Sequence, residues 1–303
     1  MNYLRTVGRD IINKKTVYLM VLPLVVYLIV FAYMPMYGII IAFKDYSPYK
    51  GILASEWAGL EYFKMFFESQ YFLQILRNTL VINIYGLVIG FPIPIIFAIL
   101  LNEVRSTRYK KSIQTITYMP HFISIMVIST MIIEFCSADS FINSIIEFFG
   151  GERVSLLSEP KLFPLIYTIS GVWQQFGWDS IIYLAALTGI NMELYEVARV
   201  DGANRFKQII HITLPGITHT IVLMLILKIG NMLSVGFEKI ILISNPLVRE
   251  TSEVISTFVY SRGLQNGDYS YSTAVGLLNA VVNFMLLTLA NGISRKYNET
   301  SLW

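Results

Sequence analysis

Long apolar runs separated by shorter polar segments dominate this 303-residue chain. A run of about 20 residues is long enough for an α-helix to cross a hydrocarbon core of about 30 Å. Only helices can satisfy the backbone hydrogen bonds of such isolated segments in lipid. The pattern therefore predicts an all-α integral membrane protein with six transmembrane helices, at residues 17–43, 79–101, 112–135, 162–187, 216–243 and 273–293.

The composition supports the membrane class. The chain is 55% hydrophobic and 14% charged, with a mean hydropathy of +0.59, whereas a soluble domain carries about 25% charged residues. The single cysteine, Cys136, excludes an intramolecular disulfide framework and any multi-cysteine metal site. The three histidines show no metal-ligand spacing, so we expect no metal site.

The distribution of lysine and arginine predicts the orientation. Thirteen basic residues fall in the amino-terminal segment, the loop after the second run, the loop after the fourth run and the tail. These segments alternate along the chain and therefore share one side, which the positive-inside rule makes cytoplasmic. We expect a cytoplasmic segment at 1–16, a transmembrane domain at 17–293 and a cytoplasmic tail at 294–303, with both termini inside.

One cytoplasmic loop, "YEVARVDGANRFKQIIHITLPGI" at residues 195–217, is unusually rich in charge. Asn191 is a good N-cap for a helix whose apolar face holds Leu194, Val197 and Ala198. Gly202 ends this helix, because glycine reaches positive φ without penalty. A second short amphipathic helix follows, and Pro215 is expected to break it before the fifth span.

These residues resemble a known signature. Glu196-x-Ala198, Gly202 and Ile212-x-Leu214-Pro215 are similar to the EAA signature of permease subunits of bacterial ABC importers. Val197 departs from the usual alanine. Further stretches, among them "YMPMYGIIIAFKDYSP" and "GWDSIIYLAALTGI", resemble the LplB-like oligosaccharide and polysaccharide permeases, so the resemblance covers about residues 15–297. It implies the type I ABC importer permease fold in the bacterial cell membrane, and an oligosaccharide as substrate.

The resemblance also implies partners. Residues about 191–215 would form the coupling helices that insert into a cleft on an ATP-binding subunit. The implied complex contains a second homologous permease, two ATP-binding subunits that hold ATP and magnesium, and an extracytoplasmic sugar-binding lipoprotein. This chain would bind no cofactor and no nucleic acid, and it contains no G-x-x-x-x-G-K-[ST] motif. The residues expected to couple to the ATPase are Glu196, Ala198, Arg199, Asp201, Gly202, Ala203, Leu214 and Pro215.

Polar and aromatic residues within the spans are candidates for the sugar pathway, because sugars offer both hydroxyl groups and apolar C–H faces. The candidates are Trp173, Gln174, Trp178, Asn231, Glu238, Asn279 and Asn283. Hydrogen bonding between helices is the alternative use of these side chains. The roles of Asp179, Lys228 and Glu238 stay open.

Other functions remain as alternatives. One alternative is an ABC permease for a non-sugar solute, and weaker ones are a secondary transporter and an intramembrane enzyme. A secondary transporter would be expected to show inverted repeats or carboxylates at mid-span, and the sequence shows no convincing repeat. An intramembrane enzyme would need a nucleophile–base pair at membrane depth, and the sequence shows no such pair and no G-x-S-x-G elbow. The sequence does not identify the sugar, and it does not tell whether substrate contacts this subunit or its partner.

Overall fold

The protein is helical along almost all of the part that the structure, a computed structural model, describes: residues 14–298 and 301–302. Most of the predicted amino-terminal segment and the end of the predicted tail therefore lie outside the described residues. A two-stranded antiparallel sheet, β1 Lys44–Asp45 and β2 Glu56–Trp57, pairs Lys44 with Trp57. The α-helices are α2 Lys15–Leu28, α3 Gly51–Ala54, α4 Glu61–Glu68, α5 Phe72–Tyr85, α6 Pro92–Asn102, α7 Thr107–Tyr118, α8 Ile125–Cys136, α9 Phe141–Phe148, α10 Phe163–Thr188, α11 Met192–Val200, α12 Arg205–Gln208, α13 Leu214–Gly230, α14 Phe237–Ile243, α15 Arg249–Ser252, α16 Ile255–Tyr260 and α17 Tyr269–Asn298.

Short 3₁₀ and π segments extend or connect these helices. The π segments are η1 Ile29–Tyr33, η3 Gly86–Gly90, η6 Ile209–Thr213 and η8 Ser261–Gln265. The 3₁₀ segments are η2 Met34–Phe43, η4 Met119–Phe122, η5 Leu156–Ser158 and η7 Pro246–Val248.

Five described segments are long and apolar enough to cross a membrane, and a sixth passes only as a bent pair. The five are Lys15–Phe43, Phe72–Asn102, Ile125–Phe148, Arg205–Gly230 and Tyr269–Lys296. The sixth joins α10 to α11 with a bend of 71°. The first, second, fourth and sixth predicted spans each overlap one of these segments along most of their length.

The third predicted span, 112–135, is not one helix. Pro120 lies in η4 and has no N–H to continue the ladder of α7. Ser124 then caps a new helix, since its hydroxyl accepts a hydrogen bond from the Val127 N–H. The apolar segment that follows begins at Ile125 and reaches Phe148.

The fifth predicted span, 216–243, is wrong at both ends. The helical run begins at Arg205, because the π segment η6 leads directly into α13, and Pro215 stands at the second residue of α13, next to that π segment. Pro215 therefore does not break the helix as expected. The run ends at Gly230, and an irregular segment at 231–236, which we call the break, separates α13 from α14.

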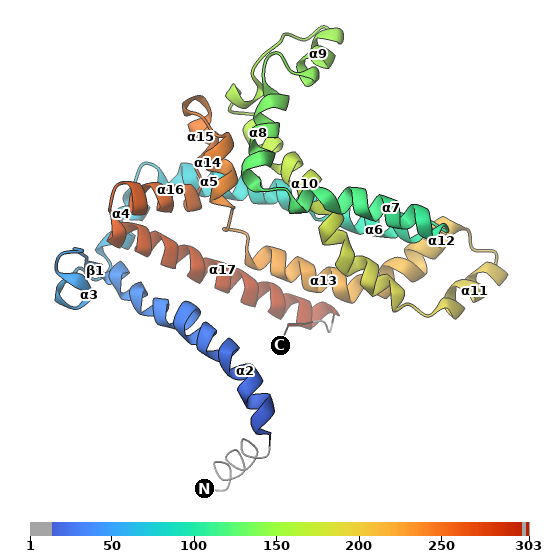
Figure 1. The fold of residues 1–303 in the computed structure, drawn as a ribbon, viewed down its shortest axis with the longest axis horizontal. Helices are drawn as coiled ribbons and strands as arrows, with labels where there is room; N and C mark the ends of the chain where they lie inside the picture. The colour runs from blue at the N-terminus through green and yellow to red at the C-terminus, as the bar shows by residue number, and fades with distance from the viewer. Residues whose placement is uncertain (1–13, 299–300, 303) are drawn as a thin grey trace.

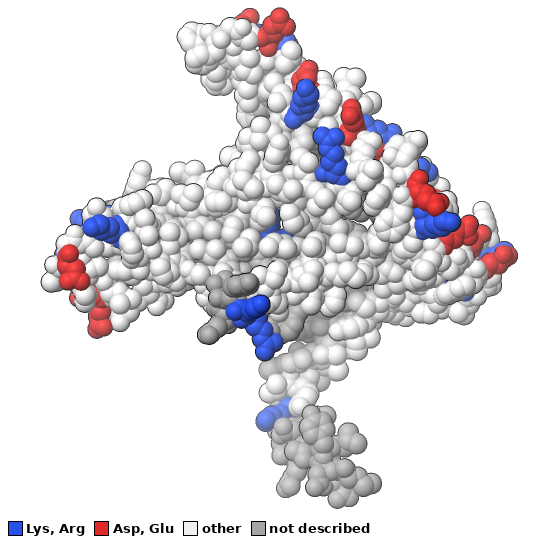
Figure 2. Space-filling model, turned by 180° about the vertical axis from the view of Figure 1, so that it is seen from behind, with Lys and Arg blue, Asp and Glu red and all other residues white. Residues whose placement is uncertain are grey.

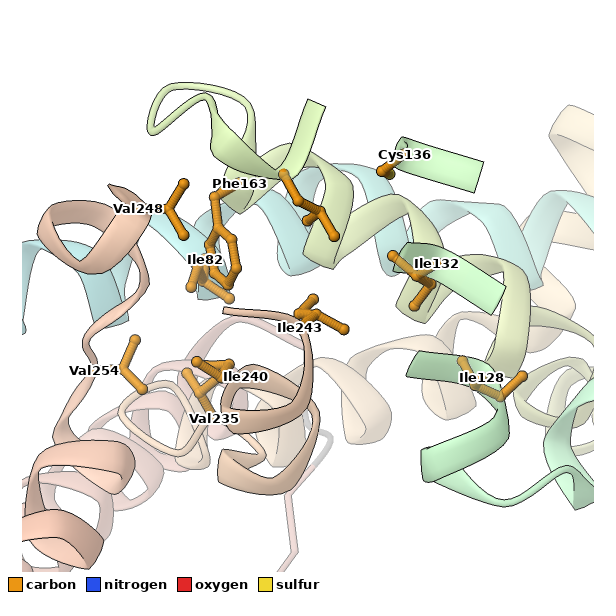
Figure 3. Packing of buried hydrophobic residues seen from close by; sticks show 11 residues of the cluster. Ile82, Ile128, Ile132, Cys136, Phe163, Val235, Ile240, Ile243, Val248 and Val254 are labelled. Carbon is orange, nitrogen blue, oxygen red and sulfur yellow. The ribbon is translucent and has the colours of Figure 1, made fainter. Parts of the chain in front are cut away.

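Three apolar clusters hold the helices together. Figure 3 shows the first, which groups the fully buried Phe163 of α10 with Ile82 of α5 and Val248 of η7. A second cluster joins α6, α10 and α13, and a third joins α4, α5, α16 and α17. In addition, Gly177 of α10 lets the backbone of α7 at Thr117 approach so closely that a Cβ would collide with it.

Several short elements lie at the ends of the molecule, and the charged side chains lie mostly toward its periphery. Figure 1 shows α11 and α12 together at one end and α3, β1 and α4 at the opposite end, with the long helices between them. Helix α2 stands away from the bundle, and its apolar side chains are exposed on all sides. In Figure 2 the charged side chains gather at the periphery, and the middle of that face is almost free of them. This is the distribution that a lipid-embedded band requires.

Candidate coupling surface and central cavity

Helix α11 is short, and its capping comes from its own sequence. The Asn191 side chain accepts a hydrogen bond from the Glu193 N–H at 3.0 Å and donates one to the Glu193 carboxylate at 3.0 Å. Glu193 thereby places negative charge in the first turn, and Arg199 places positive charge in the last turn. The predicted N-cap is confirmed.

The turn after α11 depends on Gly202, whose φ is +75°. The N–H of Ala203 returns to the Ala198 carbonyl at 2.8 Å, and that of Gly202 reaches the Arg199 carbonyl at 3.1 Å. No atom lies within 4 Å of the place where a Cβ would stand. The backbone conformation, and not a lack of space, therefore favours glycine here, as predicted.

Side-chain contacts fix α11 and α12 to the rest of the protein. The hydroxyls of Tyr195 and Thr213 lie 3.0 Å apart, which ties α11 to η6. Arg205 forms an ion pair of 3.1 Å with Glu103, in the turn after α6. The buried Gln208 donates to the Ala203 carbonyl at 2.9 Å. These contacts connect α11 to η6, and α12 to the turn after α6.

Large apolar side chains are exposed on α11 and α12. They form what we call the coupling surface, with Val200 88% exposed and Phe206 70% exposed. Its members are Met192, Leu194, Val197, Val200 and Phe206. Such an apolar patch rimmed by charge is typical of a protein-binding site.

The structure divides the predicted coupling residues into three groups. Glu196, Arg199, Asp201 and Gly202 are exposed around the coupling surface. Ala198 and Ala203 are half-buried and supply the carbonyls that close the turn. Leu214 packs into the cluster of α6, α10 and α13, and Pro215 is exposed at the start of α13. The last two thus lie on the span and outside the surface.

A second feature lies between the spans. Two adjoining hollows, of about 280 Å³ and about 250 Å³, share Gly90, Asp179 and Lys228 in their linings. We call them together the central cavity. Its walls come from α5, η3, α6, α10, α13 and the break, and its polar lining residues include Asn83, Tyr167, Gln175, Asp179, Tyr183, Lys228, Asn231 and Ser234.

The predicted pathway residues do not all reach this cavity. Asn231 lines it. Trp173 and Glu238 are exposed, and Gln174 is buried, but none of the three is in its lining. Trp178 stacks on His121 with ring centroids 4.3 Å apart, and His121 in turn bonds to the cavity residue Gln175 at 2.8 Å.

The two asparagines of the last span have separate positions. Asn283 accepts a hydrogen bond from the Leu233 N–H at 2.9 Å and donates one to the Ser234 hydroxyl at 3.0 Å. It therefore holds the break in place. Asn279 lines a mostly apolar hollow beside α16 and α17, and its buried side-chain oxygen has no partner among the described residues.

Sequence reasoning missed several cavity residues. Asn83, Tyr167, Gln175 and Ser234 were not among the candidates, although each lines the cavity. A signal was present for the last of them, because Asn231, Ser234 and Gly236 together interrupt an apolar run with residues that favour turns.

Comparison with known proteins places the chain among transport proteins. Residues 90–299 match the family described as binding-protein-dependent transport system inner membrane component. The chain is 45% identical over 294 residues to the polygalacturonan/rhamnogalacturonan transport system permease protein YteP of Bacillus subtilis, covering 97% of this chain and 92% of that protein. It is 44% identical over 292 residues to protein LplB of the same organism, covering 96% of this chain and 92% of that protein.

The fold also matches a solved structure. A chain from the crystal structure of a bacterial ABC transporter involved in the import of the acidic polysaccharide alginate aligns with a TM-score of 0.88 and 41% identity, covering 97% of this chain and 99% of that chain. A second crystal structure, of the alginate transporter in complex with an alginate pentasaccharide-bound periplasmic protein, matches with the same values.

Proposed function

The chain belongs to the family of binding-protein-dependent transport system inner membrane components, and on that basis we propose that it is coupled to its ATPase through the coupling surface and imports an oligosaccharide through the central cavity. It is a multi-pass protein of the cytoplasmic membrane and a permease subunit of an ABC importer. It is a transport component and not an enzyme.

The names of similar proteins support a saccharide as substrate. One is a permease for polygalacturonan and rhamnogalacturonan, and another belongs to an importer of alginate. This chain is 45% and 41% identical to these two proteins over nearly its whole length, and we therefore transfer the saccharide substrate class to it. The amide, hydroxyl and phenol groups around the central cavity suit the hydroxyl groups of a sugar.

The partners follow from the same premise. The alginate transporter was crystallised in complex with a periplasmic protein that holds the pentasaccharide, and this supports an extracytoplasmic binding protein for the present chain. We further propose two ATP-binding subunits and a second, homologous permease. The two permeases would form a heterodimer that encloses the pathway. ATP and magnesium would belong to the ATP-binding subunits.

The observation that carries the coupling role is the continuous helical path from the coupling surface to the central cavity. One helical run leads from Arg205, beside the turn at Gly202, to Lys228 in the cavity lining. The Tyr195–Thr213 contact attaches α11 to this run, and the Arg205–Glu103 ion pair attaches the start of the run to the turn after α6. Movement of α11 with a closing ATPase would therefore shift α6 and α13, two walls of the cavity. That coupling is the physical requirement for switching access from one side of the membrane to the other.

Exchange of one exposed residue tests this role. Val200→Glu places a charge in the middle of the coupling surface, where no described residue is disturbed. We expect the variant to reach the membrane and pair with the second permease but to lose the ATP-binding subunit during purification. Leu53→Glu, at a residue 83% exposed near the opposite end of the molecule, is the matched control and should retain it. Equal retention of the ATP-binding subunit by both variants would remove the coupling role from α11.

A further inference from the structure

The central cavity and the wall behind it together carry more positive than negative charge. Its lining contains one carboxylate, Asp179, and one ammonium group, Lys228. A second ammonium group, Lys239, lies behind the wall at Gly171, where a Cβ would stand 3.6 Å from its Nζ. Gly171 itself lines the cavity, so no side chain at this position separates the Lys239 ammonium from it.

Neither lysine is neutralised by an ion pair with a described residue. Lys239 is only 6% exposed, donates one hydrogen bond to the Tyr167 carbonyl at 3.1 Å, and lies 4.8 Å from the centre of the Tyr167 ring. Within the described part of the chain, no carboxylate oxygen lies within 4.0 Å of its Nζ or of the Nζ of Lys228. An ammonium group removed from water without a partner is costly. Lys239 is such a buried group, and together with the exposed Lys228 in the cavity lining it indicates an anionic ligand.

The other charged groups nearby do not cancel this surplus. Asp179 interacts electrostatically with Lys228 and with His121, but it is the one carboxylate in the cavity lining, whereas one lysine lies in the lining and a second lies behind it. Glu238 interacts electrostatically with Tyr167, yet it is exposed and is absent from the cavity lining.

We propose that the central cavity is a carboxylate-binding site for an acidic oligosaccharide, with Lys228 as its direct ligand. This inference rests on the proposed function, since it names the class of saccharide that the pathway accepts. The ammonium of Lys228 contacts a uronate carboxylate, and Lys239 adds to the attraction through the thin wall at Gly171. Asp179 competes with the substrate for Lys228, and Asn83, Asn231 and Ser234 are placed to bind sugar hydroxyls.

Two opposed substitutions test this assignment in the complete transporter, reconstituted with its binding protein. Lys228→Met should reduce uptake of an acidic oligosaccharide by about tenfold or more, since a hydrogen bond to a charged group is lost, while Lys228→Arg keeps most of it. Asp179→Asn should have the opposite effect and lower the substrate concentration needed for half-maximal uptake, because the competing carboxylate is gone. If Lys228 and Asp179 had only structural roles, Lys228→Met and Asp179→Asn would both impair transport. Lys239→Met should give a smaller loss than Lys228→Met.

The substrates are oligogalacturonides and oligomannuronates, each compared with the same oligosaccharide after reduction of its carboxylates to alcohols. Uptake of an acidic form, together with its loss in Lys228→Met, supports the proposal. Uptake of reduced forms alone, or undiminished acidic uptake by Lys228→Met in an intact complex, overturns it while the saccharide function stands. Failure of the wild-type transporter to import either form would instead overturn the proposed saccharide function, and this inference with it.

Discussion

The hydroxyl groups of Tyr195 and Thr213 lie 3.0 Å apart, and this contact joins α11 to the helical run that leads to the central cavity. Tyr195 is half-buried, so its phenol lies between the exposed coupling surface and the bundle. The position of α11 therefore depends on a bond that can be removed without changing the exposed residues.

Tyr195→Phe removes this bond and leaves the ring. A neutral hydrogen bond contributes about 0.5–1.5 kcal/mol, so we expect the affinity for the ATP-binding subunit to fall about two- to tenfold. Titration of the detergent-solubilised permease pair with that subunit measures the change. A double-mutant cycle with Thr213→Val provides the control, and additive losses would show that the two hydroxyls are not coupled.

Gly202→Val should uncouple ATP hydrolysis from transport. A side chain at φ +75° costs about 1–3 kcal/mol, which is too little to unfold a six-span bundle but enough to displace a short docking helix. The measurement compares ATP hydrolysis with sugar uptake in proteoliposomes. Gly202→Asn is the matched control, because asparagine tolerates the left-handed conformation, and it should stay close to wild type. Equal coupling in the Val and Asn variants would contradict a backbone constraint at this turn.

Asn283→Ala should destabilise the protein at the break. The substitution leaves the Leu233 N–H without its acceptor and the Ser234 hydroxyl without its donor. Loss of a partner by a buried polar group costs about 1–3 kcal/mol. Thermal unfolding of the purified complex measures the loss. Thr288→Ala is the control, since Thr288 bonds only within its own helix, to the Phe284 carbonyl; an equal shift for both would mean that Asn283 does not hold the break.

Site-directed labelling tests the orientation predicted from the basic residues. Single cysteines replacing the exposed residues Arg108 and Lys207 should be unreactive toward an impermeant maleimide in intact cells and reactive after lysis. A cysteine at Glu152, in the loop between α9 and α10, should react in intact cells. The native Cys136 is buried in the first apolar cluster, so the parent chain should give little background. Reaction of Lys207→Cys from outside would invert the orientation and exclude the coupling role together.

Much of the fold could be predicted because lipid imposes simple demands. Apolar length alone located four of the spans, and the basic loops between them gave an orientation that stays a prediction. The N-cap at Asn191 and the turn at Gly202 were also predictable, since both depend on properties of single residues and on local backbone geometry.

Sequence reasoning failed where neighbouring elements determine the outcome. Pro215 was expected to break a helix, but the π segment at Ile209–Thr213 allows the helix to continue through it. The break after Gly230 is held by Asn283, 50 residues from Leu233 along the chain, and no local pattern reveals that contact.

The candidate site shows the same limit. The central cavity combines residues from α5, α10, α13 and the break, so membership depends on which face of each helix points inward. Gln174 and Lys228 both interrupt apolar runs, yet only Lys228 reaches the cavity. Periodicity within one span cannot make that distinction when two faces contact protein.

The central claim, that the coupling surface docks on an ATP-binding subunit, is tested most directly by photo-crosslinking from Val200. Benzoylphenylalanine at this residue, which is 88% exposed, should leave the fold unchanged. In membranes that contain the whole transporter, illumination should join this chain to the ATP-binding subunit. The same group at Phe148, which is 84% exposed in α9, should give no such product. A product with the extracytoplasmic binding protein, or no ATPase product from Val200 in an actively transporting sample, would contradict the account.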